Sequence, residues 1–159
     1  MSPEEHIQKL MAESKEFANW FNGQLPTIVG VEAVNFYKES FQKEGFTDEA
    51  LEKWPEVKRR SNPKRTDRAA ASRPILTGET ADLGRSIEYY AMPGETTIKA
   101  DTMGAGSDKD YAAAHNEGTT TAGRGNKTTI PKRQFMGKSR TLNKKIEKIT
   151  ADMIKQILK

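Results

Sequence analysis

Few side chains in this 159-residue chain are of the kinds that carry out acid–base, nucleophilic or metal chemistry. There is no cysteine, which excludes thiolate nucleophiles, thiolate metal ligands and disulfides. The histidines are His6 and His115, and neither is accompanied by further ligands at the spacing of a zinc site. We therefore predict no metal and no cofactor.

His115 is the strongest candidate for a catalytic group. It precedes Asn116 and Glu117, so the segment could supply a base with an orienting acid. No serine stands in a recognised nucleophile setting, such as the glycine-flanked elbow of hydrolases. A structural His115 is therefore favoured, and we predict no enzymatic activity. An enzyme built on His115 is kept as a third alternative, which predicts that His115→Ala would preserve the fold and abolish an activity.

The remaining groups that could take part in binding or catalysis have simpler explanations. Gly123, Arg124 and Gly125 could bring backbone close to a phosphate, but they lack the Walker pattern and its strand–turn–helix setting. Several carboxylates stand near predicted helix starts, where the helix dipole accounts for them: Glu4, Glu5, Asp48, Glu49 and Glu52.

Positive charge is concentrated in a basic loop, predicted over residues 56–74. The net charge of +4 is by itself weak evidence for a nucleic-acid partner. A solvated surface connection is the favoured interpretation, and electrostatic contact with DNA or an acidic protein face is the alternative. No aromatic residue is interleaved with the cations, so stacking of single-stranded bases is unsupported. The candidate contact residues are Lys58, Arg59, Arg60, Lys64, Arg65 and Arg68, and a second basic region runs over residues 127–148.

Length and composition predict one domain over residues 1–159 with a modest core. Hydrophobic residues make up only 35% of the chain, so a partner could complete part of the apolar surface. No run of about 18 apolar residues is present, and the first ten residues are acidic and polar, unlike a signal peptide. We expect no membrane contact, and synthesis and use in cytoplasm or in an assembly built there.

The elements that must position these groups begin with two helices. Ser2 and Glu5 form a capping-box pattern for an amphipathic helix over roughly residues 3–21, which Asn22-Gly23 would end. A second helix begins near Pro26 and should stop at Gly45. Because the connection is short, the two helices should be antiparallel neighbours.

The middle of the chain predicts short elements. Residues 47–49 look like the cap of one helical turn that Pro55 closes, with Phe46 and Trp54 holding it to the helical pair. A second helical turn near Asp82 would present Leu83 and Ile87 to the core. Strands over 85–91 and 96–100 flank a proline–glycine turn, which indicates a hairpin. A polar loop is expected over residues 101–109.

The last third predicts a short helix, a loop and a long helix. Residues 111–116 favour a helix that Gly118 ends, and residues 118–127 should form a mobile loop. A short strand over 128–130 returns to the sheet, and Phe135 enters the core. The final helix starts near Ser139; its apolar stripe favours core packing over docking to another subunit. The stripe consists of Leu142, Ile146, Ile149, Met153 and Ile157.

Three ordered motifs resemble the phage virion morphogenesis family, the Mu-type tail-completion proteins. The first is the 41–46 segment, Phe-Gln-Lys-Glu-Gly-Phe, with Trp54 after it. The second is Leu-Thr-Gly at 76–78 with Leu-Gly-Arg-Ser-Ile at 83–87. The third combines Tyr111, His115 and Gly118 with Ile-Pro-Lys-Arg-Gln-Phe-Met-Gly at 130–137. The basic loop is less like the family.

The resemblance implies an α+β fold. A helical pair and a long C-terminal helix would pack on a small antiparallel sheet, with long flexible loops. It also implies a non-enzymatic structural protein of a tailed phage or prophage, acting at the neck or tail end in tail completion and head–tail joining. The alternative is a small basic DNA-binding or packaging accessory protein, which predicts salt-sensitive binding to duplex DNA.

The 118–127 loop is the candidate assembly element, since a segment that orders only against its partner can delay contact until that surface exists. We expect Tyr111 and His115 to fix its N-terminal root, and Pro131 and Phe135 its C-terminal root. Arg133 would pair with a carboxylate or face a partner. The assembly-loop residues are Tyr111, His115, Gly118, Gly123, Arg124, Gly125, Pro131, Arg133 and Phe135.

The expected partners are other phage neck or tail proteins and further copies of the chain. A homo-oligomeric ring would form in the virion, although the isolated chain could be a monomer, and weak DNA contact is allowed. The protein would be found in the host bacterial cytoplasm during assembly and then in the virion.

Overall fold

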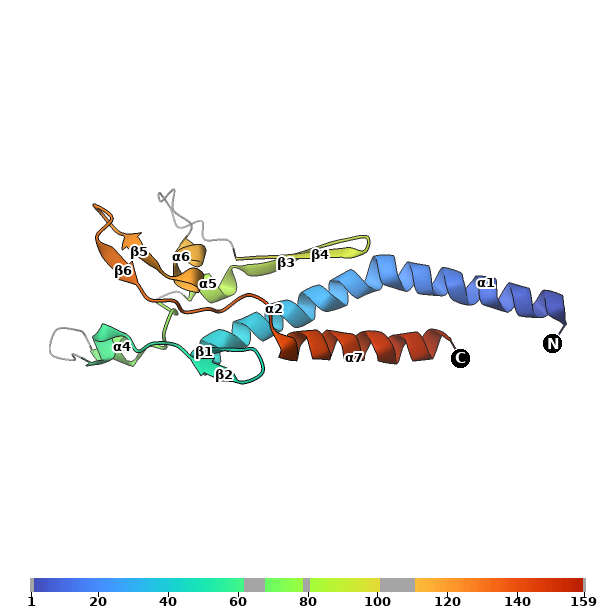
Figure 1. Ribbon diagram of the computed structural model, residues 1–159, viewed down its shortest axis with the longest axis horizontal. Helices are drawn as coiled ribbons and strands as arrows, with labels where there is room; N and C mark the ends of the chain where they lie inside the picture. The colour runs from blue at the N-terminus through green and yellow to red at the C-terminus, as the bar shows by residue number, and fades with distance from the viewer. Residues whose placement is uncertain (1, 62–67, 79–80, 101–110, 159) are drawn as a thin grey trace.

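The computed structural model describes residues 2–61, 68–78, 81–100 and 111–158. The molecule is elongated (Figure 1), with a long N-terminal helix at one end and short helices and hairpins at the other. Helices and antiparallel strand pairs are mixed, so the predicted α+β class is confirmed.

The N-terminal helix begins where the sequence predicted. α1 spans Pro3–Asn19, and both hydrogen bonds of the capping box are present. The Glu5 N–H donates to the Ser2 hydroxyl at 3.2 Å, and the Ser2 N–H donates to the Glu5 carboxylate at 2.6 Å. These bonds satisfy helix-end donors that would otherwise lack partners.

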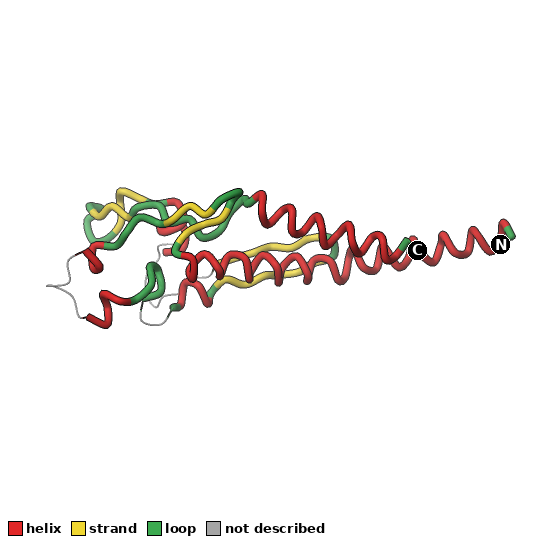
Figure 2. The backbone as a smooth tube through the Cα atoms, turned by 90° about the horizontal axis from the view of Figure 1, so that it is seen from below, coloured by secondary structure: helices red, strands yellow, loops and turns green. Residues whose placement is uncertain are grey.

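The predicted antiparallel pairing of the first two helices is wrong. α1 passes through a π-helical turn at Trp20–Gln24 (η1) into α2, Leu25–Lys43, and the chain keeps its direction (Figure 2). The Leu25 N–H bonds to the Trp20 carbonyl, one residue farther back than in an α-helix. This wider turn accommodates Pro26, which lacks an N–H and would disrupt a regular α-helix. Gly23 therefore does not act as a helix stop.

The antiparallel neighbour of the long helix is instead α7, Arg140–Ile157. Ser139 caps it by accepting a hydrogen bond from the Leu142 N–H at 3.2 Å. Leu142 and Ile157 of the predicted stripe are buried, whereas Ile146, Ile149 and Met153 are half-buried. The stripe therefore packs toward the long helix, as the sequence favoured, with incomplete cover along its middle.

α2 carries the core of the molecule. Its Phe41 ring packs 5.6 Å from Trp54 and 5.3 Å from Phe135, measured between ring centroids. At Gly30 the helix crosses the ring of Tyr89 so closely that an added Cβ would lie 2.3 Å from it. The buried core cluster comprises Ala33, Val34, Tyr37, Phe41, Phe46, Trp54, Ile75, Leu83, Ile87, Ala112, Phe135 and Leu142.

The strands form three separate two-stranded sheets in the described part of the chain, rather than one small sheet. β3, Ile87–Met92, and β4, Glu95–Ala100, make the predicted hairpin against α2. β1, Gly45–Thr47, and β2, Leu51–Lys53, form a hairpin where a helical turn was predicted. Glu44, with φ of 49°, takes the left-handed conformation expected at Gly45, and the Trp54 N–H returns to its carbonyl at 2.8 Å.

Short helices connect these units. The predicted basic loop contains α3, Lys58–Ser61, and α4, Arg68–Ser72. α5, Asp82–Arg85, presents Leu83 to the core as expected, and α6, Tyr111–Glu117, ends before Gly118 at φ of 76°. The polar loop predicted over 101–109 lies outside the described residues. None of the described helices combines the length and apolar character that a membrane span requires.

Candidate functional site

The predicted mobile loop is a β-hairpin, which we call the arm (residues 118–130). β5, Thr119–Ala122, pairs with β6, Thr128–Ile130, through Thr119 opposite Ile130 and Ala122 opposite Thr128. Gly123 and Gly125 take φ of 74° and 82° in the turn. The expectation of a mobile loop overlooked the threonines, whose β-branched side chains favour strands, while the glycines and an asparagine supply the turn. The arm stands at the end of the molecule opposite the N-terminus (Figure 1).

The two ends of the arm come together at a tight crossing. A Cβ on Gly118 would lie 2.8 Å from the Lys132 nitrogen, so only glycine fits there. One residue farther, the Arg133 N–H donates to the His115 carbonyl at 2.8 Å. The crossing joins α6 to the segment that follows β6, and Pro131 lies exposed between them.

Asn116 ties this crossing to the core, a role that the sequence did not reveal. Its side-chain oxygen accepts the N–H groups of Phe135 and Met136 at 2.9 and 3.0 Å. Phe135 is 1% exposed and packs on Phe41. The arm is thus mounted on a segment whose next residues are part of the buried core.

Arg133 lies buried behind the arm, with 7% of its surface exposed. Its Nε and Nη2 groups donate to the Pro55 carbonyl at 3.1 and 3.0 Å, and Nη2 also reaches the Glu56 carbonyl at 3.4 Å. The sequence predicted a carboxylate or a partner for Arg133. Within the described residues it donates to main-chain carbonyls, which orient the guanidinium group without neutralising its charge.

Tyr111 and His115 lie on α6, near Arg133. Their ring centroids lie 4.3 Å apart in an edge-to-face contact. Burial, with a smaller effect from the Arg133 charge, lowers the pKa of His115, and burial raises the pKa of Tyr111. Glu117 accepts a hydrogen bond from Asn116 at 2.6 Å, so the side chain expected to orient a His115 base is engaged elsewhere.

The basic loop is partly used for internal bonding. Arg60 pairs with Glu44 through two hydrogen bonds of 3.0 and 2.5 Å, and Glu44 also accepts the Ile75 N–H at 2.8 Å. The hydrogen bond from Arg60 is the main reason that the pKa of Glu44 is lowered. Arg59 donates Nη2 to the carbonyls of Arg73 and Pro74 at 3.0 and 2.7 Å.

Of the other predicted cations, Lys58 alone has a side chain that the structure describes. Lys58 is exposed at the start of α3. Arg68 begins α4, but its side chain is not described, and Lys64 and Arg65 lie outside the described residues. Of the basic-loop residues that the structure describes, Arg59 lies close enough for its charge to act on Arg133 and Tyr111.

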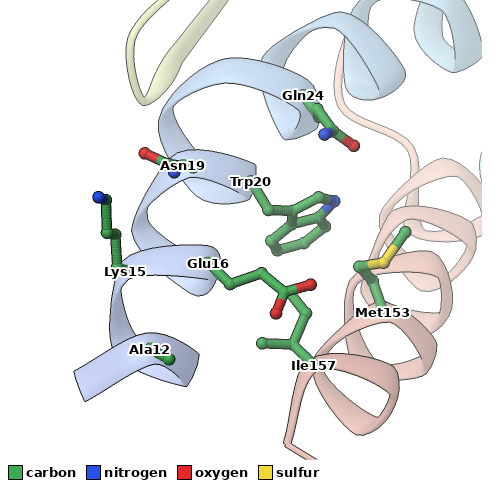
Figure 3. Close-up of a pocket in the computed structure, with 8 residues that line it drawn as sticks. All are labelled: Ala12, Lys15, Glu16, Asn19, Trp20, Gln24, Met153 and Ile157. Carbon is green, nitrogen blue, oxygen red and sulfur yellow. The ribbon is translucent and has the colours of Figure 1, made fainter. Parts of the chain in front are cut away.

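A cavity of about 450 Å³ lies far from the arm, between the α1–η1 junction and the end of α7. Figure 3 shows Trp20 among its lining residues, with Glu16 on the same helix and Met153 and Ile157 on α7. The lining contains no histidine or serine, and no group of three metal-ligating side chains occurs among the described residues. We assign no chemistry to this cavity.

Comparison with known proteins connects this architecture to a family. Residues 40–155, more than half of the chain, match the phage virion morphogenesis family. The match runs from the end of α2 into the last turns of α7 and contains both the arm and the basic loop, while α1 lies outside it. No curated protein and no solved structure matches the chain.

Proposed function

We propose that this chain, which belongs to the phage virion morphogenesis family, is a non-enzymatic protein that completes the tail and prepares it for joining to the head. Membership in the family gives the chain a role in building a phage particle. The place at the neck or upper tail, and the joining step, are our proposal.

The mounting of the arm is the observation that carries this proposal. Within the described residues, β5 and β6 pair only with each other, and most of their side chains are exposed. The arm root is nevertheless fixed at Gly118, at the His115–Arg133 main-chain bond and at Asn116. A hairpin that buries little but is rigidly held has strand edges ready to pair with another protein.

Shortening the arm tests the proposal. Replacing residues 120–129 with Asn-Gly keeps Thr119 opposite Ile130 and closes the strands with a favoured two-residue turn. The unfolding free energy should change by less than about 1 kcal/mol, because the removed residues lie outside the core. A phage carrying the variant should accumulate separate heads and tails, counted by electron microscopy, and yield few infectious particles.

A matched variant separates the tip from the strands. Replacing only residues 123–126 with Asn-Gly retains β5 and β6. If strand edges make the contact, this variant should still assemble, whereas the shorter arm should not. Normal infectious yield from the shorter arm would remove the arm from the mechanism.

The expected partners follow from the same proposal: other neck or tail proteins, and further copies of this chain in a ring that forms in the virion. The alternative, a DNA-binding or packaging accessory protein, loses support because Arg60 of the basic loop is already paired with Glu44. A cation paired with a carboxylate has less charge and fewer donors left for phosphates.

A further inference from the structure

Cationic and polar groups converge behind the root of the arm. Arg133 contacts the carbonyls of Pro55 and Glu56, and Arg59 follows three residues after Glu56, on α3. Tyr111 packs against His115, whose carbonyl bonds to the Arg133 N–H. α3, α6 and the irregular segment after the arm thus meet at one place, which we call the root site (Arg59, Tyr111, His115 and Arg133).

The positive charge of the root site is only partly compensated, by the Glu56 carboxylate acting on Arg133. Neither Arg59 nor Arg133 forms an ion pair with a carboxylate among the described residues; their hydrogen bonds go to main-chain carbonyls. Arg133 is 93% buried, since only 7% is exposed, and burial followed by repulsion from Arg59 lowers its pKa. A buried charge without an opposite partner is costly, so the site favours an anion.

Polar atoms at the root site also lack partners. The Arg59 Nε–H and the His115 Nδ1 are buried and lack hydrogen-bond partners in the described part of the chain. No hydrogen bond of the Tyr111 hydroxyl is found there either, and half of that residue is exposed. A buried donor without a partner destabilises the fold, and a suitable acceptor would recover that loss.

We propose that the root site binds a carboxylate, supplied by an aspartate or glutamate on a neighbouring protein of the particle. Its oxygens accept hydrogen bonds from the Arg59 guanidinium and the Tyr111 hydroxyl, and the Arg133 charge stabilises the pair from behind. The identity of the partner depends on the proposed assembly role, whereas the binding of a carboxylate at this site does not. A partner held at the root of the arm would sit beside the strand edges, so the two contacts would belong to one surface.

The recessed position of the charge favours a protein carboxylate over duplex DNA. Regularly spaced phosphates bind to open rows of exposed cations, and Arg133 is almost completely covered. The half-exposed Tyr111 offers a single acidic side chain a contact at the edge of the site, and arginine and tyrosine are enriched at the energetic centres of protein interfaces.

A titration of the full chain with sodium acetate tests the chemistry, with sodium chloride at equal ionic strength as reference. Nitrogen NMR follows the Arg59 Nε–H and the His115 ring. Acetate should shift both signals saturably and raise the pKa of His115, because an anion beside it stabilises the imidazolium. Chloride should produce neither saturation nor that rise.

Three variants assign the response to the site. Arg59→Gln should abolish the acetate response, whereas Lys58→Gln removes the same charge from an exposed neighbour and should leave it intact. Tyr111→Phe keeps the ring contact with His115 and should weaken acetate binding about tenfold, the worth of one charge-assisted hydrogen bond. An equal response in Arg59→Gln and Lys58→Gln would overturn the site. If Arg59→Gln fails to fold, Tyr111→Phe replaces it as the test, and unchanged acetate binding by Tyr111→Phe would overturn the site.

Two further measurements address the occupant. If a short duplex DNA shifts the same signals and displaces acetate, the occupant is a phosphate and the carboxylate partner is refuted. In the phage, Arg59→Gln should reduce infectious yield and Lys58→Gln should not; equal yields would refute the partner at this site. Because the shortened arm is a separate variant, the two proposals are tested independently. The assembly role of the arm can be refuted while acetate still binds at the root site, and acetate binding can be refuted while the arm is still needed for assembly.

Discussion

At the scale of single residues, His115 gives the protein a pH-dependent stability. Its pKa is lower in the folded protein than the ordinary value of 6.5, mainly through burial. The unfolded chain therefore binds the proton more readily, and stability falls as pH drops below about 6.5 toward the folded pKa. We predict that His115→Gln flattens the rise of the urea midpoint between pH 5.5 and 7.5.

Measurement above the range of the carboxylates isolates this contribution. Glu44 also has a lowered pKa, from an ordinary value of 4.5, so its stabilisation is lost only at more acid pH. An identical pH dependence in the wild-type protein and His115→Gln would show that His115 is as well solvated in the folded state as in the unfolded chain.

The residues that organise the site were the hardest to predict from the sequence. Asn116 bonds to main-chain groups 19 and 20 positions away, and Glu44 bonds to the N–H of a residue 31 positions away. Local patterns carry no information about such partners. The carbonyl partners of Arg133 at Pro55 and Glu56 likewise depend on the folded path of the chain.

At the scale of elements, Gly30 controls the contact between α2 and the β3–β4 hairpin. A methyl group there would meet the Tyr89 ring at 2.3 Å, so the hairpin would have to move. We predict that Gly30→Ala lowers the unfolding free energy by about 1–3 kcal/mol, measured by urea denaturation. Gly23→Ala is the matched control, since nothing lies within 4 Å of its added methyl. It should leave stability unchanged or raise it by up to about 1 kcal/mol. Equal effects of the two substitutions would mean that α2 and Tyr89 do not pack this closely.

Elements with strong local signals were predicted well. The capping box fixed the start of α1, and the spacing of apolar residues fixed α7. The strand predicted over 128–130 is β6, but it pairs with β5 instead of returning to a larger sheet. β5 and the β1–β2 hairpin were missed because their strands are short and lack alternating apolar residues. A left-handed Glu44 was also unexpected, because its conformation is held by the distant bonds to Arg60 and Ile75.

At the scale of the whole molecule, the direction of the chain at residues 20–26 decides the shape. Asn22-Gly23 before Pro26 is typical of a helix end, and an antiparallel pair was predicted from it. The π-helical turn satisfies the backbone and keeps the helix running, so α1 extends beyond the body instead of folding back (Figure 1). A wider helical turn and a reversal use the same residues, and contacts with distant segments distinguish them, including the hydrogen bond from the Thr96 hydroxyl to the Pro26 carbonyl at 2.7 Å.

The exposure of α1 leads to the last prediction. None of its residues is buried, and Ile7, Leu10 and Met11 are 57%, 51% and 69% exposed. Deleting residues 2–11 should change the unfolding free energy by less than about 0.5 kcal/mol, because no core contact is lost. Trp20→Ala, at the junction with α7, should cost about 3–5 kcal/mol, because that side chain is 3% exposed.

The same deletion should shorten the molecule measurably. Nine helical residues, from Pro3 to Met11, at about 1.5 Å each correspond to roughly 14 Å, and the N-terminus lies at the extreme end of the long axis (Figure 1). Small-angle X-ray scattering of the full chain and the deletion variant should show this difference in maximum dimension while both unfold at the same urea concentration. An unchanged dimension, or a large loss of stability, would mean that α1 lies against the body in solution and that its apolar stripe is covered by the chain's own residues.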